Sequence, residues 1–430
     1  MVITGRFVLL AAAGALALLL APSWTTVWIL CAVLVLPLVV DALLAASPRK
    51  LRFARQLPGS IRLSQSCTAE LFVANKGRRT VRGSLRDAWQ PSAGATPGLL
   101  RLSVPRGERR RLNLSLTPTR RGDLHSQTIT VRSLGPLGLA GRQRTAVVPG
   151  RLRVLPEFRA RKHLASKLRK LRELEGLSAV QIRGAGTEFD SLRDYVRGDD
   201  VRSIDWRATA RRQAVVVRTW RPERDRRVVI VADTSRTSAA RILDEPRLDS
   251  YLEAALLLGV LADRGGDRVS FLAFDRRPRA QVTSAQKTNL LGAMVQAMAP
   301  LTSELIEMDW TQVPSQVRQM TAHRALVVLL TSLDSGALEE GLLPVVARLS
   351  RDHVVVVASV SDPALEAMRA QRKNSTEVYA AAAAERSVLD RAAVIALLKQ
   401  AGAEVVEAEP QELPPRLADL YLRLKAAGRL

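Results

Sequence analysis

The residues best suited to chemistry follow RRVVIVAD, an apolar sequence typical of a buried strand. Asp233, Ser235 and Thr237 stand there at alternate positions. One carboxylate and two hydroxyls can converge on Mg²⁺ as hard oxygen ligands, and they leave positions open for water or for an acidic group of a partner. Loops after other strands could add Thr288, in KTNLL, and Asp334, in LLTSLDSG. Taken alone, D-x-S-x-T is equally well explained by helix capping, because Asp and Ser are favoured N-cap residues.

A second group of charged residues lies in LRDYVRGDDVRSIDWRATARR, residues 192–212. Its carboxylates are interspersed with guanidinium groups: Asp194, Asp199, Asp200 and Asp205 alternate with Arg193, Arg197, Arg202, Arg207 and Arg211. Arginine forks suit bidentate pairing and hold carboxylates ionised. Catalysis more often needs a carboxyl of raised pKa or a nucleophile beside a base, and this segment contains no His, Cys or Lys. We therefore expect a structural ion-pair cluster that joins two domains, with a partner-docking surface and an active site as the alternatives.

The same segment is expected to begin with a short helix that ends at Gly198. Asp199 and Asp200 are suited to cap the turn that follows. Apolar side chains would anchor both elements, namely Leu192, Tyr195 and Val196 in the helix and Ile204 and Trp206 in the turn.

Other catalytic patterns are weak or missing from the sequence. The four histidines are not spaced as an HExxH or paired-ligand motif, and nothing nominates a Ser-His-Asp triad. Cys31 and Cys67 make no plausible disulfide framework or zinc site. GAGTEF opens like a dinucleotide-binding fingerprint, but it lacks the third glycine and does not follow a buried strand. No GxxxxGK[ST] loop is present.

The elements that must position Asp233 alternate between strands and helices in residues 227–430. Continuous Val-rich strands such as HVVVVASV are typical of a parallel sheet that is covered on both faces. We therefore expect an α/β fold with a doubly wound parallel sheet, whose ligands lie at the carboxyl ends of the strands. The expected helices are Leu248–Ala262, Lys287–Met298, Ala337–Leu349 and Val388–Ala401.

Residues 51–156 follow a different pattern. RLNLSLTP places Leu112, Leu114 and Leu116 on one face, and turn sequences such as NKG and PRG separate similar segments. This predicts a small β-sandwich-like domain. Residues 157–185 are basic and helix-permissive, so we expect a helical connector along a domain surface, with a nucleic-acid or membrane helix as the alternative. The charged segment then occupies residues 186–226.

Residues 1–47 are predicted to form two transmembrane helices. No charged residue occurs from Phe7 to Val40. A single helix of that length would reach about 50 Å, which is too long for a hydrocarbon core of about 30 Å. Pro22 stands where a turn is needed. The expected spans are Val2–Ala21 and Trp24–Ala46, with Trp24 and Trp28 as interfacial anchors.

Basic residues directly after the second span indicate its orientation, and they are Arg49, Lys50, Arg52 and Arg55. By the positive-inside rule, everything after residue 47 lies in the cytoplasm. A cleaved signal peptide ending near Ser23 is the alternative, and it leaves the same orientation. We therefore expect a multi-pass membrane protein whose soluble part is cytoplasmic.

The formal net charge of +24 is concentrated in one half of the chain. Residues 227–430 carry 24 Lys and Arg against 25 Asp and Glu, so the whole excess lies in residues 1–226. A basic surface beside a membrane segment favours attraction to anionic lipid headgroups. A solvated surface without a partner is one alternative, and nucleic-acid binding is the other and less favoured one.

RRVVIVADTSRTS resembles the opening of a von Willebrand factor A-type domain. Such domains hold a metal-ion-dependent adhesion site made of D-x-S-x-S with a distant Thr and Asp. The resemblance implies a Mg²⁺ site at Asp233, Ser235, Thr237, Thr288 and Asp334. Two departures concern that site. The third ligand is Thr, which keeps the hydroxyl, and TSLDSG stands where these domains usually have a compact TDG.

The charged segment is the more specific match. GTEFDSLRDYVRGDDVRSIDWRATARRQAVVVRTW resembles the signature of the bacterial family called domain of unknown function 58, and RRGDL and GPLGL resemble its β-region. The signature residues are Glu188, Arg193, Tyr195, Gly198, Asp199, Asp200, Arg202, Asp205, Trp206 and Arg211. With the two spans, the resemblance covers nearly the whole chain. It implies a membrane hairpin, a β-domain, a von Willebrand A-like domain and an association with MoxR-type AAA+ ATPases, while the family's biochemical activity is not established.

Together these observations predict a non-enzymatic, membrane-tethered interaction protein of the bacterial inner membrane. Its A-like domain would bind a cytoplasmic partner through the strand-end residues and Mg²⁺, and the resemblance implies a MoxR-type AAA+ ATPase as that partner. One alternative is a hydrolase that uses Asp233 and Asp334 to hold a catalytic metal ion. The other is nucleic-acid binding by the basic N-terminal half.

Overall fold

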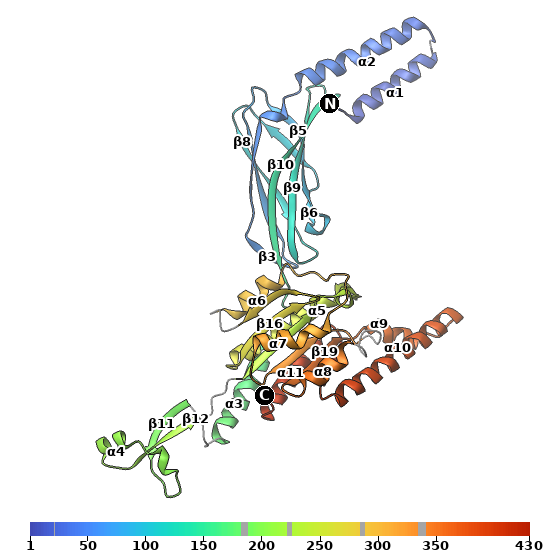
Figure 1. The fold of residues 1–430 in the computed structure, drawn as a ribbon. Coiled ribbons are helices and arrows are strands. Elements are labelled where there is room, and N and C mark those ends of the chain that lie inside the picture. The colour runs from blue at the N-terminus through green and yellow to red at the C-terminus, as the bar shows by residue number, and fades with distance from the viewer. Residues whose placement is uncertain (21, 182–187, 222–225, 284–288, 334–340) are drawn as a thin grey trace. The chain divides into compact units, whose positions relative to one another are not determined.

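The structure is a computed structural model of residues 1–430, and it describes all of them except 21, 182–187, 222–225, 284–288 and 334–340. The chain forms two compact units, Met1–Glu157 and Phe158–Leu430 (Figure 1). The first unit contains a helical hairpin and two sheets, and the second contains a six-stranded sheet between helices and a separate two-stranded sheet. The expected α/β class, with several sheets and an apolar N-terminal helix, is confirmed.

The first unit begins with two apolar helices, α1 (Gly5–Leu20) and α2 (Trp24–Leu44). The Ser23 hydroxyl accepts a hydrogen bond of 3.1 Å from the Thr26 amide and caps α2. The stretch Trp24–Lys50, which contains α2, is long and apolar enough to cross a membrane, with a mean hydropathy of 2.7, and most of it is exposed. The described part of the shorter α1 is also apolar.

The start of the chain differs from the expected first span, Val2–Ala21. Val2–Ile3 forms strand β1, which pairs with Ala140 and Gly141 instead of continuing the helix, so α1 begins at Gly5. The Thr4 hydroxyl also donates a hydrogen bond of 2.7 Å to the Gly138 carbonyl. The first helix is therefore attached to the β-domain at its beginning.

Two sheets form the β-domain. One has the order β1-β10-β9-β5-β7, with β3 also on β10, and the other has the order β2-β4-β8-β6. The strands are β2 (Leu51–Gln56), β3 (Ser60–Arg62), β4 (Cys67–Asn75), β5 (Val81–Trp89), β6 (Ala95–Thr96), β7 (Leu100–Val104), β8 (Arg109–Leu116), β9 (Gly122–Leu134) and β10 (Ala140–Leu155). One apolar core contains Leu71 and Val73 from one sheet and Leu85 and Val131 from the other, so the sheets pack face to face.

A buried ion pair joins the two sheets. Arg55 on β2 lies 2.5 Å from Asp87 on β5, and each side chain is 3% exposed. The Ser126 hydroxyl and the Trp89 indole also donate hydrogen bonds to the Asp87 carboxylate, at 2.7 and 2.9 Å. Burial lowers the pKa of Arg55, and Asp87 opposes that change by favouring the charged guanidinium.

The second unit is built round a sheet of order β17-β16-β13-β18-β19-β20. All neighbours are parallel except the edge strand β17, which is antiparallel to β16. The strands are β13 (Arg227–Asp233), β16 (Arg268–Phe274), β17 (Pro278–Thr283), β18 (Leu326–Leu330), β19 (Val354–Val360) and β20 (Glu404–Ala408). The helices are α3 (Arg161–Gln181), α5 (Arg247–Arg264), α6 (Leu290–Met298), α7 (Val313–Met320), α8 (Leu343–Leu349), α9 (Pro363–Ala370), α10 (Ser375–Gln400) and α11 (Leu413–Ala426).

Different helices cover the two faces of this sheet (Figure 1). Along β13, Val228 and Ile230 pack in a core with α5, α6 and α11. Val229 and Val231 pack in the opposite core with α7, α8 and α10. Because both faces of the central strands are buried, their sequences are continuously apolar instead of alternating. The basic helix α3 lies on the first face, where Leu171 is buried.

Several elements differ from the sequence-based expectation. The expectation omitted the edge strand β17 and the helices α7, α9 and α11. It also began α10 at Val388, whereas α10 starts at Ser375, where Asn374 accepts a hydrogen bond of 2.9 Å from the Glu377 amide. The described part of α6 begins at Leu290 instead of Lys287. The alanine-rich first half of α10 carries a weak apolar period, which explains why its start was placed too late.

Candidate functional site

The candidate site lies at the carboxyl ends of two neighbouring parallel strands. β13 ends at Asp233, and β18 ends at Leu330, one residue before Thr331. Ala232 pairs with Leu330 in the sheet, so the residues that follow meet at one edge. The Thr331 hydroxyl donates a hydrogen bond of 2.7 Å to Asp233 Oδ2.

The loop after β13 surrounds the same carboxylate. The Ser235 amide donates a hydrogen bond of 2.7 Å to Asp233 Oδ1, and the Thr237 hydroxyl donates one of 3.0 Å to Asp233 Oδ2. Ser235 Oγ lies 3.3 Å from Thr237 Oγ1. The Ser238 hydroxyl bonds back to the Asp233 carbonyl at 2.7 Å, which holds the turn tight. One carboxylate and the hydroxyls of Ser235, Thr237 and Thr331 therefore converge at this edge.

The Asp233 carboxylate is removed from solvent. Asp233 is 2% exposed, Ser235 and Thr331 are buried with it, and Thr237 is half-buried. Burial raises the pKa of Asp233, while the hydrogen bonds from Ser235, Thr331 and Thr237 oppose that rise. Within the described residues, the hydrogen bonds to this carboxylate come from neutral donors. An ionised carboxylate in such surroundings is destabilised unless a cation joins it.

A second buried carboxylate, Asp275, lies at the same edge, directly after β16. The Thr234 hydroxyl donates a hydrogen bond of 3.1 Å to Asp275 Oδ2, and the Arg276 amide donates one of 2.6 Å to Oδ1. Arg279 Nε lies 3.4 Å from Asp275 Oδ2 and offsets its charge. The two carboxylates therefore differ, because Asp275 has an ion-pair partner and Asp233 is surrounded by neutral donors.

Three of the five predicted metal ligands, Asp233, Ser235 and Thr237, lie together. The other two, Thr288 and Asp334, lie outside the described residues. No group of three or more His, Cys, Asp or Glu side chains in the described part of the chain could hold a metal ion, so a metal here would need hydroxyls and water in addition to the Asp233 carboxylate. Sequence reasoning missed Thr331, although its place directly after the apolar ALVVLL is the same signal that selects Asp233.

The charged segment forms an antiparallel pair of strands with two short helices between them. β11 (Glu188–Asp194) pairs with β12 (Val216–Arg221), and the helices are η3 (Val201–Ser203) and α4 (Trp206–Arg212). The expected helix containing Leu192, Tyr195 and Val196 is therefore wrong. β12, which follows α4 in the chain, supplies the hydrogen bonds to β11. A partner so distant in sequence cannot be predicted from the local pattern. Gly198 has a φ of 111°, a backbone angle that favours glycine.

Two Arg–Asp pairs stabilise the segment. Arg193 forks onto Asp199 at 2.8 and 2.6 Å, and Arg218 Nε lies 2.9 Å from Asp205 Oδ2. The pairing with Arg193 lowers the pKa of Asp199. The hydrogen bond from the Ala208 amide, followed by that from Arg218, lowers the pKa of Asp205. Both carboxylates are therefore ionised near neutral pH, which does not suit a general acid.

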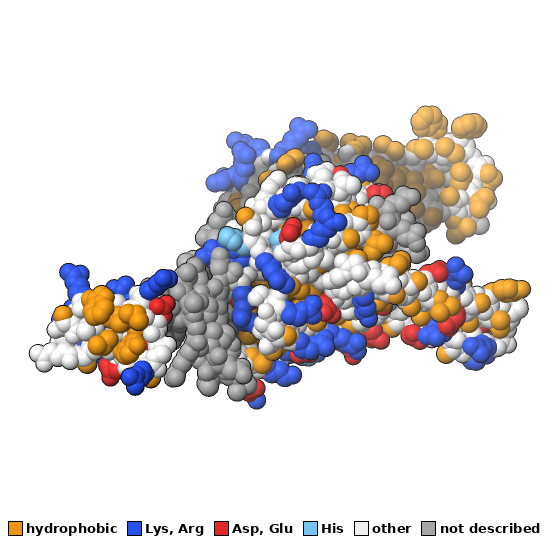
Figure 2. Space-filling model, turned by 60° about the horizontal axis from the view of Figure 1, so that its bottom comes forward, with side chains coloured by type: hydrophobic (Ala, Val, Ile, Leu, Met, Phe, Trp, Pro, Cys, Tyr) orange, Lys and Arg blue, Asp and Glu red, His pale blue; other side chains and the backbone are white. Residues whose placement is uncertain are grey.

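The remaining signature residues have structural contacts or are exposed. Asp200 caps η3 by accepting a hydrogen bond of 3.0 Å from the Arg202 amide, the Tyr195 amide donates one of 2.8 Å to Val215, and Arg211 Nε donates one of 3.2 Å to Arg207. Glu188 begins β11. Trp206, expected as an apolar anchor, is 67% exposed, and Val196 and Val201 are exposed with it. Hydrophobic side chains are visible on this segment at the left of Figure 2.

Residues 191–395 match the family model described as "Protein of unknown function DUF58". Conserved hypothetical protein BatB from Bacteroides thetaiotaomicron is 15% identical over 47% of this chain and 99% of its own, with a TM-score of 0.31. Proximal thread matrix protein 1 from the mussel byssus, solved with a zinc-occupied MIDAS motif, is 12% identical over 46% of this chain and 45% of its own, with a TM-score of 0.28. The CARDB domain of the PF1109 protein from Pyrococcus furiosus is 17% identical over 26% of this chain and 89% of its own, with a TM-score of 0.20. No curated protein matches the chain.

Proposed function

Because this chain belongs to the DUF58 family, whose function is not established, we propose a function from the geometry at Asp233. The protein is a non-enzymatic, membrane-tethered interaction protein. Its C-terminal domain is von Willebrand A-like and presents Asp233 with its surrounding hydroxyls, together with Mg²⁺, to an acidic group of a cytoplasmic partner. A MoxR-type AAA+ ATPase is the partner that the family resemblance implies.

The observation that carries this proposal is the buried carboxylate of Asp233 among three hydroxyls. Mg²⁺ prefers oxygen ligands, is bound through one or two carboxylates and keeps several waters. Asp233, Ser235, Thr237 and Thr331 would hold the ion. The bound ion would supply a positive charge on which a carboxylate of the partner can replace water. Thr237 is the member of the set that solvent reaches, so the partner would approach past it.

The same surroundings do not favour catalysis. The Ser235 and Thr237 hydroxyls interact with each other and with Asp233. None of the four histidines, all of which lie in the described part of the chain, shares a hydrogen bond with this cluster. The hydrolase alternative uses Asp334, which lies outside that part.

We also propose that α1 and α2 both span the bacterial inner membrane and that the remainder of the chain lies in the cytoplasm. Large apolar side chains on both helices are exposed, among them Leu9, Leu16, Trp28, Val33 and Leu36. Exposure of this kind suits contact with lipid. The basic residues that follow α2 support the cytoplasmic orientation.

Co-purification from native membranes tests the proposal. The wild-type chain, Asp233→Ala and the matched control Asp244→Ala, which changes an exposed carboxylate, are each captured with Mg²⁺ and with EDTA. We expect a partner that is retained by the wild type and the control in Mg²⁺ and lost from Asp233→Ala and in EDTA. Identical partner sets with and without Mg²⁺ would remove the metal-dependent form of the proposal.

A further inference from the structure

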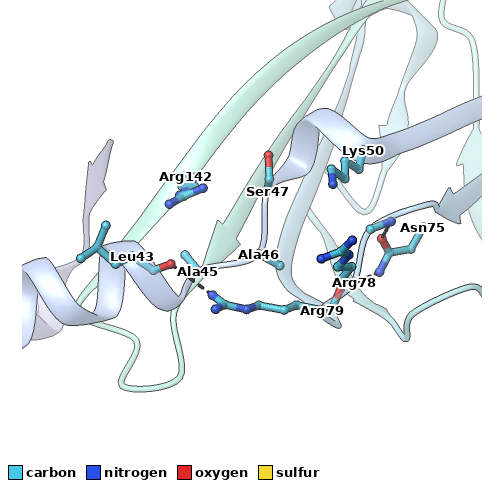
Figure 3. Close-up of a pocket in the computed structure, with 10 residues that line it drawn as sticks. Leu43, Ala45, Ala46, Ser47, Lys50, Asn75, Arg78, Arg79 and Arg142 are labelled. Carbon is cyan, nitrogen blue, oxygen red and sulfur yellow. Dashed lines mark hydrogen bonds between the residues drawn. The ribbon is translucent and has the colours of Figure 1, made fainter.

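A small hollow lies where α2 meets the β-domain (Figure 3). Its volume is about 180 Å³, which is room for several water molecules. The end of α2 and the residues after it form one side, with Leu43, Ala45 and Ala46 as its apolar part. Four basic residues, Lys50, Arg78, Arg79 and Arg142, line the rest. The hollow therefore joins an apolar helix end to a concentration of positive charge.

Two of the four basic side chains neutralise the end of the helix. Arg79 Nη1 donates hydrogen bonds of 3.2 and 3.0 Å to the carbonyls of Leu43 and Leu44, and Arg142 Nε donates one of 3.1 Å to the carbonyl of Ala42. The carboxyl end of a helix carries a partial negative charge that would repel an anion. These guanidinium groups offset that charge, so an anion can approach the end of α2.

The other two basic side chains are exposed at the hollow. Lys50 and Arg78 have no ion pair with any residue in the described part of the chain, and both line the hollow together with Ser47 (Figure 3). The turn that carries Arg78 is held by Asn75, which is buried. Its amide donates hydrogen bonds of 3.0 Å to Val104 and 2.9 Å to Arg79. The backbone of the basic wall is therefore fixed before any ligand arrives.

We propose that this hollow binds the phosphate group of an anionic phospholipid headgroup. The inference rests on the proposed membrane tether, because α2 would place the hollow at the level of the headgroups. Lys50 and Arg78 hold the phosphate, Ser47 offers a hydroxyl, and the exposed Leu43 and Leu44 of α2 contact the acyl chains that lead away from it. Inorganic phosphate has no apolar part that could contact Leu43 and Leu44, so the geometry favours a lipid.

Native mass spectrometry of the full chain in detergent tests this inference. The protein is titrated with phosphatidylglycerol, phosphatidylcholine and inorganic phosphate. The wild type should retain phosphatidylglycerol in preference to phosphatidylcholine. In Lys50→Gln/Arg78→Gln the dissociation constant for phosphatidylglycerol should rise at least about tenfold, because each basic residue near a membrane surface contributes about fivefold.

The matched control is Arg62→Gln/Arg120→Gln, which removes two exposed charges elsewhere on the β-domain. Arg62 ends β3, which pairs with the opposite end of β10 from Ala140. The control should change the dissociation constant less than about twofold. If both double variants weakened phosphatidylglycerol binding equally, the attraction would be diffuse and the inference would be overturned. Displacement of the lipid by inorganic phosphate at equal concentration would overturn it as well. Recovery of the wild-type chain in the soluble fraction would instead overturn the membrane tether, and this inference with it.

Discussion

Asp41 and Gly135 lie so close together that a β-carbon on Gly135 would stand 2.2 Å from Asp41 Oδ1. Asp41, in the last part of α2, is fully buried. Its carboxylate accepts hydrogen bonds of 2.7, 2.7 and 2.8 Å from the amides of Leu137, Leu139 and Ala140. The glycine thus makes room for a carboxylate that attaches the end of α2 to the β-domain.

Asp41→Ala should destabilise this attachment strongly. The substitution leaves amides without an acceptor, and each buried group left unpaired costs about 1–3 kcal/mol. Hydrogen exchange at Leu137, Leu139 and Ala140 should accelerate, and the midpoint of thermal unfolding in detergent should fall. Asp41→Asn keeps one acceptor oxygen and should be intermediate. Unchanged exchange at these amides in Asp41→Ala would contradict the assignment.

Asp87→Ala should be among the most destabilising substitutions in the β-domain. It leaves the Arg55 guanidinium buried without its counter-charge, which costs about 3–5 kcal/mol. Urea unfolding measures the loss, and Arg55→Met/Asp87→Leu should be more stable than Asp87→Ala alone. As the control, Glu70→Gln removes a partly exposed pair with Arg111 and should cost about 1 kcal/mol or less. Equal losses in Asp87→Ala and Glu70→Gln would refute the argument.

The stability of the β-domain should depend on Asp123 in acid. Arg153, followed by Arg151, lowers the pKa of Asp123 to about 2, against about 3.9 in an unfolded chain. Because the folded value is the lower one, the stabilisation is fully present above the unfolded value and is lost as the pH falls through about 2. A carboxyl NMR titration should find this midpoint, and Arg153→Gln should raise it. A midpoint near 4 in the wild type would disprove the pairing.

Magnesium should stabilise the second unit through Asp233. A ligand at one hundred times its Kd adds about 2.7 kcal/mol to the free energy of unfolding. The Tm of the wild type should rise when Mg²⁺ is added and fall back to its metal-free value in EDTA. The Tm of Asp233→Asn and of Thr331→Val should change little with Mg²⁺. Asp244→Asn serves as the exposed control. An equal rise in Asp233→Asn would place any bound Mg²⁺ elsewhere.

The local sequence pattern predicted the structure correctly where the burial of each residue depends on its own strand and the loop that follows it. The continuous valines of β13 and β19 predict strands buried on both faces, because helices pack on each side. The D-x-S-x-T spacing predicts that Asp233 and Thr237 lie together, since the chain turns immediately after the strand. Thr331 could have been found by the same rule applied to β18.

Contacts between distant segments were not predictable from local patterns. Asp41 looks like a polar end of an apolar helix, and its amide donors are supplied by a loop nearly one hundred residues later. The apolar residues Leu192, Tyr195 and Val196 before Gly198 suggested a short helix, but Leu192 lies in β11, to which β12 provides the hydrogen bonds. Trp206 looked like a core residue, yet it lies on an α4 that offers it little apolar cover.

The helical hairpin is fastened to one loop at both ends, through Thr4 at Gly138 and through Asp41 at Leu139. A single flexible joint would let the β-domain swivel under its anchor. Two attachment points on one loop restrict that rotation. A force on β10 would therefore tilt both helices together with the β-domain.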